Sequence, residues 1–211
     1  MALRSDGTST SSGSSSSDTR QSVSQKSEIR VEEDRLSIKG TDWSIHQLLE
    51  GSAYADRFRG GIFTHAFLDT FDYHRWHAPV RGKVLEARVL QGRAYLDVRP
   101  GAAIEDGKPV RVLGVVDGTG YQFVQTRGLV VLDSPIGLVA CLPMGMAQVS
   151  SVVITAGVGV TLRKGEELGY FQFGGSDFAM VFERASNGRL IAQPGVHGRQ
   201  GTWIGTAFPC R

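Results

Sequence analysis

The residues with the clearest potential for chemistry lie where an aromatic run meets two glycines and a serine. Residues 169–173 read Gly-Tyr-Phe-Gln-Phe, Gly-Gly-Ser-Asp fills 174–177, and an apolar run continues over 178–182. The pattern predicts a strand interrupted by backbone without side-chain constraint, because glycine tolerates conformations that other residues avoid. Ser176 therefore stands where its hydroxyl can approach the carbonyl of Gly175.

A serine hydroxyl is a weak nucleophile unless a base lies beside it and the target carbonyl is within reach. Attack of Ser176 on the carbonyl of Gly175 turns the amide into an ester. Elimination then leaves a dehydroalanine, which hydrolyses to a pyruvoyl group on a new chain terminus. Such a ketone condenses with a substrate amine and accepts the electrons released on decarboxylation, otherwise the task of a bound cofactor. Taken alone, the tripeptide also fits an ordinary hairpin or bulge.

A second group of reactive side chains fills residues 71–79, which read Phe-Asp-Tyr-His-Arg-Trp-His-Ala-Pro. Histidine titrates where proton transfer near neutral pH needs it, so His74 or His77 could deprotonate Ser176 while the other manages protons during decarboxylation. A pair of surface or core histidines is the alternative. No cysteine or third histidine stands nearby at a ligand spacing, so no metal site is predicted. His65, in an apolar run, is expected to be a core residue.

The composition predicts one ordinary folded domain. The chain has 211 residues, of which 41% are apolar and 9% aromatic, enough to fill a core. The net charge is +2 and the basic residues are scattered, so no nucleic-acid partner is predicted. Cys141 and Cys210 have no metal or redox spacing, and a reducing compartment follows. We expect a cytoplasmic protein, with a mitochondrial location also compatible.

Residues 1–34 differ from the remainder because they are rich in serine and poor in large apolar side chains. This composition predicts a disordered tail, followed by one domain over 35–211. No apolar segment follows the first residues, so a secretory signal is not expected. The most apolar stretch, 128–160, is interrupted by Asp133 and Pro143 among others, and no membrane span is predicted.

The pattern beyond residue 35 predicts a mainly β (α+β) fold, a compact barrel-sandwich-like β core with a short helical entry segment. Residues 43–49 have helical periodicity, with Thr41 or Asp42 as the cap, and 54–58 continue helically until two glycines. Strand-like runs are expected at 36–38, 62–68, 82–90, 93–98, 110–116, 121–125, 129–132, 136–142 and 150–154.

Three motifs, in order, resemble the pyruvoyl-dependent, self-cleaving phosphatidylserine decarboxylase family. They are LSIKGTDWSIHQLL at 36–49, DYHRWHAP at 72–79 and KGEELGYFQFGGSD at 164–177, and the likeness covers residues 35 to 209. The middle of the chain also looks like the soluble relatives that include tryptophan decarboxylases.

The resemblance implies cleavage between Gly175 and Ser176. Ser176 would become the pyruvoyl group at the start of an α chain, residues 176–211, which would stay associated with a β chain ending at 175. In the family the second histidine of the DYHRxH motif, here His77, belongs to a serine-protease-like triad for cleavage. The first histidine, here His74, is implicated in decarboxylation.

One departure from the family concerns the acid of that triad. In the family it lies in a motif like Pro-Val-Asp-Gly upstream, and nothing like it precedes Leu36. Residues 32–34 read Glu-Glu-Asp instead, and Asp34 is the closest candidate by position. The resemblance thus predicts an amino-terminally shortened member, a substitute acid, or loss of processing.

Several functions remain open from the sequence. The resemblance implies a substrate that is an amine-bearing carboxylate. The first expectation is conversion of phosphatidylserine to phosphatidylethanolamine, at a membrane surface for which no anchor is seen. The alternatives are decarboxylation of an aromatic amino acid such as tryptophan, or an uncleaved, inactive relative that binds a ligand. Residues 160–169 also resemble part of a biotinyl or lipoyl carrier, but Lys164 lacks the flanking residues of a carrier lysine.

Overall fold

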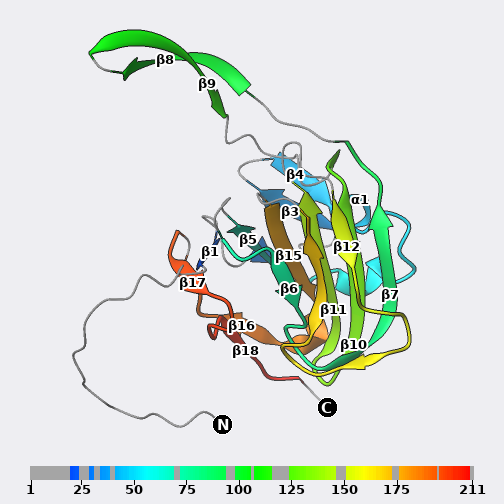
Figure 1. Ribbon diagram of the computed structural model, residues 1–211. Helices are drawn as coiled ribbons and strands as arrows, with labels where there is room; N and C mark the ends of the chain where they lie inside the picture. Colours follow the sequence, from blue (N-terminus) through cyan, green and yellow to red (C-terminus); the bar gives the residue numbers. More distant parts are fainter. Residues whose placement is uncertain are drawn as a thin grey trace, which may run out of the picture.

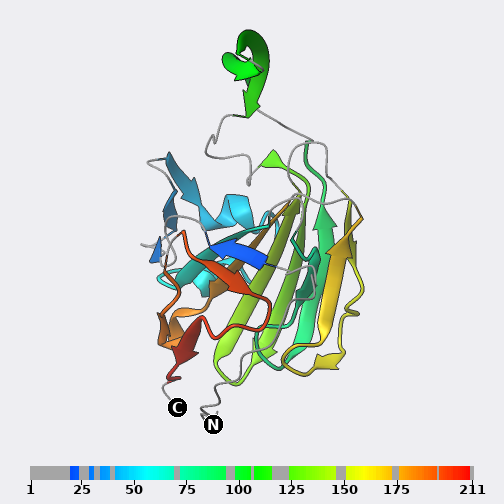
Figure 2. The ribbon, with the colours of Figure 1, turned by 60° about the vertical axis from the view of Figure 1, so that its left-hand side comes forward.

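The computed structural model describes residues 20–23, 29–30, 34–38, 41–68, 72–93, 98–105, 107–115, 124–145, 151–172, 176–193 and 195–209. Its main feature is a nine-stranded antiparallel sheet, which we call the large sheet (Figures 1 and 2). The order across it is β13-β7-β10-β11-β15-β5-β1-β17, with β2 pairing with β5 as well. The prediction of a mainly β fold is confirmed. The strands are β13 (Thr161–Leu162), β7 (Gly82–Leu90), β10 (Arg127–Ser134), β11 (Gly137–Gly145), β15 (Ser176–Phe182), β5 (Ile62–Leu68), β1 (Arg20–Val23), β17 (His197–Arg199) and β2 (Ile29–Arg30).

A second, three-stranded sheet, the small sheet, covers part of one face of the large one. Its order is β12 (Val152–Ile154), β14 (Glu167–Phe171) and β6 (Arg75–His77). The side chains between the two sheets form one core cluster, which includes Trp76, Leu168, Phe171 and Phe178. Two sheets packed over a common apolar layer make a sandwich, the arrangement that buries both inner faces.

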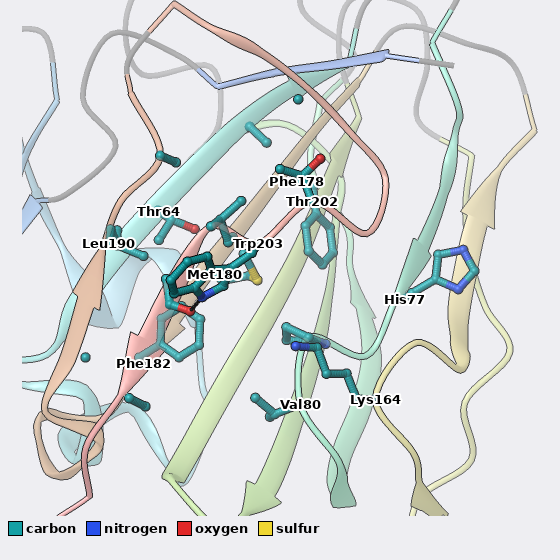
Figure 3. A pocket seen from close by; sticks show the side chains of 18 of the residues that line it. Thr64, His77, Val80, Lys164, Phe178, Met180, Phe182, Leu190, Thr202 and Trp203 are labelled. Carbon is teal, nitrogen blue, oxygen red and sulfur yellow. Dashed lines mark hydrogen bonds between the residues drawn. The ribbon is translucent and has the colours of Figure 1, made fainter. Parts of the chain in front are cut away.

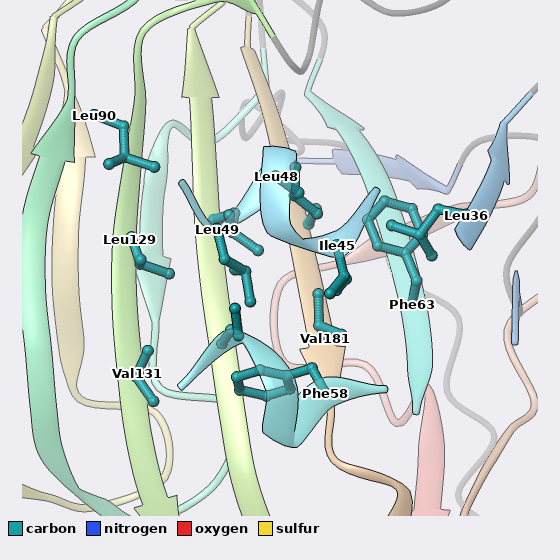
Figure 4. Close-up of a cluster of buried hydrophobic side chains, with 14 of the residues drawn as sticks. Leu36, Ile45, Leu48, Leu49, Phe58, Phe63, Leu90, Leu129, Val131 and Val181 are labelled. Atoms are coloured by element: carbon teal, nitrogen blue, oxygen red, sulfur yellow. The ribbon is translucent and has the colours of Figure 1, made fainter. Parts of the chain in front are cut away.

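The opposite face of the large sheet carries the short helical segments α1 (Ile45–Leu48) and η1 (Ala55–Phe58) (Figure 4). Ile45, Leu48 and Phe58 pack there against strand residues of a second core cluster. β10 serves both clusters because strand side chains alternate: Leu129 belongs to the helical side and Val130 to the side of the small sheet. Burial on both faces explains why this strand reads as a continuous apolar run.

Three two-stranded sheets complete the chain. β3 (Arg35–Ile38) pairs with β4 (Thr41–Ser44), and β16 (Gly188–Leu190) pairs with β18 (Gly205–Ala207) beside the large sheet. β8 (Val98–Glu105) and β9 (Lys108–Val115) form a hairpin that stands away from the body in both views (Figures 1 and 2). No helix among the described residues is long and apolar enough to cross a bilayer.

The structure differs from the sequence-based expectations at two places near the amino terminus. Within the expected tail, β1 and β2 pair with β5, because ladder hydrogen bonds need only backbone groups. The expected helix over 43–49 begins two residues later, at Ile45. Trp43 is drawn into β4 by pairing with Leu36, and Ser44 caps the helix in a capping box with Gln47.

Candidate active site

The predicted cleavage serine is the first residue of β15. Ser176 lies opposite Gly145 of β11 and also pairs with β5, so its backbone is held between two strands. Gly175 and the two residues before it lie outside the described part of the chain. Because side chains alternate along a strand, position 176 belongs to the same face of β15 as Phe178 and Met180.

The chain changes sheets immediately before Ser176. The sequence predicted one interrupted strand, but β14 belongs to the small sheet and β15 to the large sheet. Gly169 fixes the position of β14, since a Cβ there would lie 2.1 Å from the carbonyl oxygen of Val153 and 2.4 Å from ring atoms of Trp76. Only glycine allows this approach, which packs β14 directly on the tryptophan of β6.

His77 ends β6, and both of its ring nitrogens have partners. Nδ1 lies 2.9 Å from the carbonyl oxygen of Gly165, and Nε2 lies 2.8 Å from the hydroxyl oxygen of Tyr73. A carbonyl oxygen only accepts, so in the neutral ring Nδ1 carries the proton and Nε2 has the free lone pair. The Tyr73 ring also stacks on the imidazole at a centroid distance of 5.6 Å. The basic atom of His77 is therefore Nε2, which accepts from Tyr73.

The turn that supplies the Gly165 carbonyl is fixed by its own hydrogen bonds. The carboxylate of Glu166 accepts from the backbone N–H of Arg163 at 2.8 Å and from its guanidinium at 2.9 Å. These bonds, the backbone one first, hold the pKa of Glu166 below its usual value. The N–H of Gly165 donates to the carbonyl of Ala78 at 2.9 Å. His77 is thus oriented by a rigid turn.

His74 lies just before β6 and is half-buried. Its carbonyl oxygen accepts from the N–H of Phe171 at 3.0 Å, which joins the histidine motif to the segment that leads to Ser176. Beside it, Arg75 forms an ion pair with Glu167 at 2.6 Å, and this hydrogen bond raises the pKa of Arg75. The structure therefore attaches the DYHRWH segment to β14.

Sequence reasoning missed Asp177. Its carboxylate is fully buried, with Oδ2 3.1 Å from Nε2 of His65, whose ring stacks on Phe63. His65 is itself buried, as a core residue should be. The available signal was an acid placed directly after a serine inside an apolar strand. By alternation, this pair lies on the face of β15 opposite to that of position 176.

Asp34, the nearest sequence candidate for an orienting acid, has other partners. Its carboxylate accepts from the Ser44 hydroxyl at 2.6 Å and lies 2.8 Å from Nδ1 of His46. Burial alone would raise the pKa of Asp34, but these hydrogen bonds outweigh it and the pKa lies below its usual value. The structure thus corrects the sequence suggestion: Asp34 supports the start of α1, and the Gly165 carbonyl orients His77.

A cavity of about 460 Å³ opens on the face of β15 that includes position 176 (Figure 3). Its floor comes from β5 and β15, one side comes from residues 76–80, and the other side comes from residues 186–207. In Figure 3, Met180 and Phe182 are drawn beside Trp203, Phe178 stands on the other side of Met180, and the His77 ring lies apart from all of them. The cavity therefore has an apolar floor next to the predicted cleavage position.

Two residues that line the cavity carry buried polar groups that can donate a hydrogen bond. Trp76 Nε1 and Ser186 Oγ are buried and have no hydrogen-bond partner within the described residues. Both residues line the cavity, as does Lys164. An N–H and a hydroxyl that are buried without partners lose free energy unless a ligand or water accepts from them. Within the described ranges, no group of three or more His, Cys, Asp or Glu side chains is arranged to hold a metal ion.

Comparison with known proteins identifies the family of the chain. The family model of phosphatidylserine decarboxylase matches residues 14–206. A decarboxylase of Amanita muscaria, iboD, is 35% identical over 159 residues, 71% of this chain and 45% of that protein. The L-tryptophan decarboxylase of Psilocybe cyanescens is 30% identical over 172 residues, 77% of this chain and 39% of that enzyme.

A phosphatidylserine decarboxylase proenzyme of Bacillus subtilis is 30% identical over 166 residues, which are 79% of this chain and 56% of that proenzyme. The chain therefore spans about half or less of the length of the relatives it matches. The match nevertheless includes the histidine motif, the turn around Gly165 and the cleavage position. From the family model and these relatives together, the chain belongs to the phosphatidylserine decarboxylase family.

Proposed function

We propose that this chain is a pyruvoyl-dependent decarboxylase that acts on an amine-bearing carboxylate after cutting itself between Gly175 and Ser176. The observation that carries the proposal is the location of position 176. It begins β15 where the chain passes from one sheet to the other, on the strand face that floors the cavity. A group formed there would border a pocket large enough for a small substrate.

The first step of the proposal is the cleavage. The Ser176 hydroxyl oxygen attacks the carbonyl carbon of Gly175, and we assign Nε2 of His77 as the base that takes the hydroxyl proton. The C–N bond between the two residues then breaks and its nitrogen takes up a proton. β-Elimination releases the carboxylate of Gly175, and water converts the remaining dehydroalanine to the pyruvoyl group and ammonia. Support comes from the tautomer, because the Gly165 carbonyl holds the proton on Nδ1 and leaves Nε2 able to accept. Tyr73, which donates to Nε2, must release it for this step. The Gly165 carbonyl would thus fix the tautomer and orientation of His77, which is the positioning part of what the aspartate does in a serine-protease triad.

The residues around position 176 fit the group that this cleavage would create. When present, a pyruvoyl group supplies a ketone that binds a substrate amine and takes up the electron pair released with CO₂. Phe178 and Met180 shield the neighbouring floor of the cavity from water, and loss of a carboxylate is favoured where its charge is poorly solvated. We assign proton handling during decarboxylation to His74, which lies just before β6 and whose carbonyl accepts from the N–H of Phe171 in β14.

The first candidate reaction is conversion of phosphatidylserine to phosphatidylethanolamine, the activity named for several relatives. The second is decarboxylation of an aromatic amino acid such as tryptophan. The specific observation in its favour is the aromatic lining of the cavity by Phe178, Phe182 and Trp203. An uncleaved relative that only binds its ligand would use the same cavity.

The test is the intact mass of the purified chain and of two variants. The unaltered chain should give two fragments that meet between Gly175 and Ser176, the smaller one reactive with a hydrazide, and Ser176→Ala should stay whole. His77→Gln should slow cleavage by at least about 100-fold, as removal of a general base does. His197→Gln, at an exposed histidine of β17, is the matched control and should be cleaved normally. A chain that remains uncut would refute the proposal.

A further inference from the structure

We propose that Lys164 binds an anionic group of the substrate that remains in the product. The cavity would then select amines that carry a second anion besides the carboxylate that is lost. This inference rests on the proposed decarboxylase function and names the substrate class for it. A phosphodiester on a lipid headgroup and an acidic group on a free amino acid share this chemistry.

The charge of the cavity is the first argument. Lys164, Arg189 and Arg199 line it, whereas none of the described lining residues is Asp or Glu. The chain as a whole is nearly balanced, with 23 Lys and Arg against 21 Asp and Glu. The lining is therefore a local concentration of positive charge, which raises the local concentration of an anionic ligand.

The position of Lys164 is the second argument. The turn around it is held by the hydrogen bonds of Gly165 and by the ion pair of Glu166 with Arg163, so the acid two residues after Lys164 is already engaged by the arginine. In Figure 3 the Lys164 side chain extends toward the cluster of Met180, Phe182 and Trp203. A cation is thus presented to the cavity from a rigid turn.

The buried donors are the third, independent argument. Trp76 Nε1 and Ser186 Oγ line the same cavity and have no hydrogen-bond partner within the described residues. Both groups can donate, and an indole N–H can do nothing else. The residues that carry these donors line the same cavity as Lys164, and such donors suit an oxyanion with several acceptor oxygens, such as a phosphate or carboxylate.

The chemistry of decarboxylation decides which anion Lys164 holds. A cation on the departing carboxylate would stabilise the substrate more than the transition state, in which that negative charge is leaving, and would slow the reaction. A cation on an anion that persists into the product binds substrate and transition state alike. The apolar floor at Phe178 suits the departing carboxylate, and the Lys164 end of the cavity suits the retained anion.

The test measures binding to the uncut Ser176→Ala chain by calorimetry, so that it does not depend on catalysis. The soluble probes are O-phospho-L-serine and L-serine, which differ only in the second anion, and phosphatidylserine vesicles form the lipid arm. We expect Lys164→Met to weaken binding of the phosphorylated probe or of the vesicles by about tenfold or more, as loss of a charged hydrogen bond does. Lys164→Arg should restore most of it. Lys83→Met, at an exposed lysine of β7, is the matched control and should change nothing.

Each outcome bears on the proposal. Lys164-dependent binding of O-phospho-L-serine without binding of the vesicles assigns a free acidic amino acid. Lys164-dependent binding of the vesicles, with or without the soluble probe, assigns the phosphodiester of a lipid. Equal loss of L-serine and O-phospho-L-serine in Lys164→Met would show that the lysine holds the shared carboxylate and would overturn the inference. So would equal binding by the Lys164→Met and Lys83→Met chains. Failure of the unaltered chain to cut itself would refute the decarboxylase proposal but leave these binding results standing.

Discussion

Replacement of Arg127 by methionine should destabilise the protein more than any other single arginine change that leaves the cavity intact. Arg127 belongs to β10 but only 1% of it is exposed. Its Nε donates to the carbonyl of Leu48 at 2.9 Å, and its Nη2 donates to the carbonyl of Gln47 at 2.8 Å. Nη2 also lies 3.2 Å from the carboxylate of Glu50. One guanidinium thus satisfies the carbonyl groups at the end of α1.

The magnitude follows from what methionine leaves behind. Burial lowers the pKa of Arg127, and attraction to the Glu50 carboxylate partly offsets that lowering. The hydrogen-bond partners of the guanidinium compensate the cost of removing its charge from water. Methionine fills a similar volume but makes no hydrogen bond, and two carbonyls near the helical core lose their donor. Leaving a buried carbonyl without its donor costs about 1–3 kcal/mol, so the loss of two donors should lower the free energy of unfolding by about 2–6 kcal/mol.

Denaturant unfolding of the Ser176→Ala chain measures this cost on a single covalent species. The matched control is Arg163→Met, which removes an ion pair to Glu166 at a side chain that is 89% exposed. Such surface pairs contribute about 0–1 kcal/mol. If Arg127→Met costs less than about 1 kcal/mol, or no more than the control, the guanidinium does not hold α1 on the sheet and this reasoning is wrong.

Two further predictions concern packing and pH. Gly169→Ala should lower the free energy of unfolding by about 3 kcal/mol or more, because its Cβ would meet a carbonyl and the buried tryptophan ring. Gly165→Ala, at φ +88° in open space, should cost only about 1–2 kcal/mol. Equal losses of the two variants in thermal unfolding would contradict this. The lowered pKa of Asp34 means that its hydrogen bonds with Ser44 and His46 stabilise the folded state above about pH 4, and that this contribution is lost as the pH falls through the lowered pKa. Asp34→Asn should therefore unfold more easily at about pH 6, and its difference from the unaltered chain should shrink as the pH falls below about 4. A difference that stays constant over this range would contradict the reasoning.

The sequence predicted strands correctly where the residues within and directly beside a strand determine its bounds. β5 and β7 have the bounds that the sequence indicates. β5 is a mostly apolar run, β7 mixes apolar and charged residues, and both contain β-branched residues and are bounded by glycine or polar residues. The first helix was placed two residues early because Trp43 has helical spacing but pairs with Leu36 across a hairpin. Such pairing depends on a partner distant in space, which periodicity does not report.

The site was predictable in its residues and not in its geometry. Sequence motifs singled out Ser176, His74 and His77, but which groups orient the imidazole depends on a turn 88 residues further along the chain. Residues 186–207, which form one wall of the cavity, have no strand-like periodicity, so the sequence did not predict that wall. Buried charges such as Asp177 were missed because charged residues are almost always expected at the surface.

The passage of the chain from the small sheet to the large sheet determines how a cut protein would unfold. β15 lies in the interior of the large sheet, hydrogen-bonded to β11 on one side and to β5 on the other, while β14 stays in the small sheet. A cut just before Ser176 would turn one chain into two without breaking either ladder. Unfolding would then release a separate peptide, so the melting temperature of a cut protein should rise with protein concentration. The same measurement on the Ser176→Ala chain should give a melting temperature that does not change with dilution.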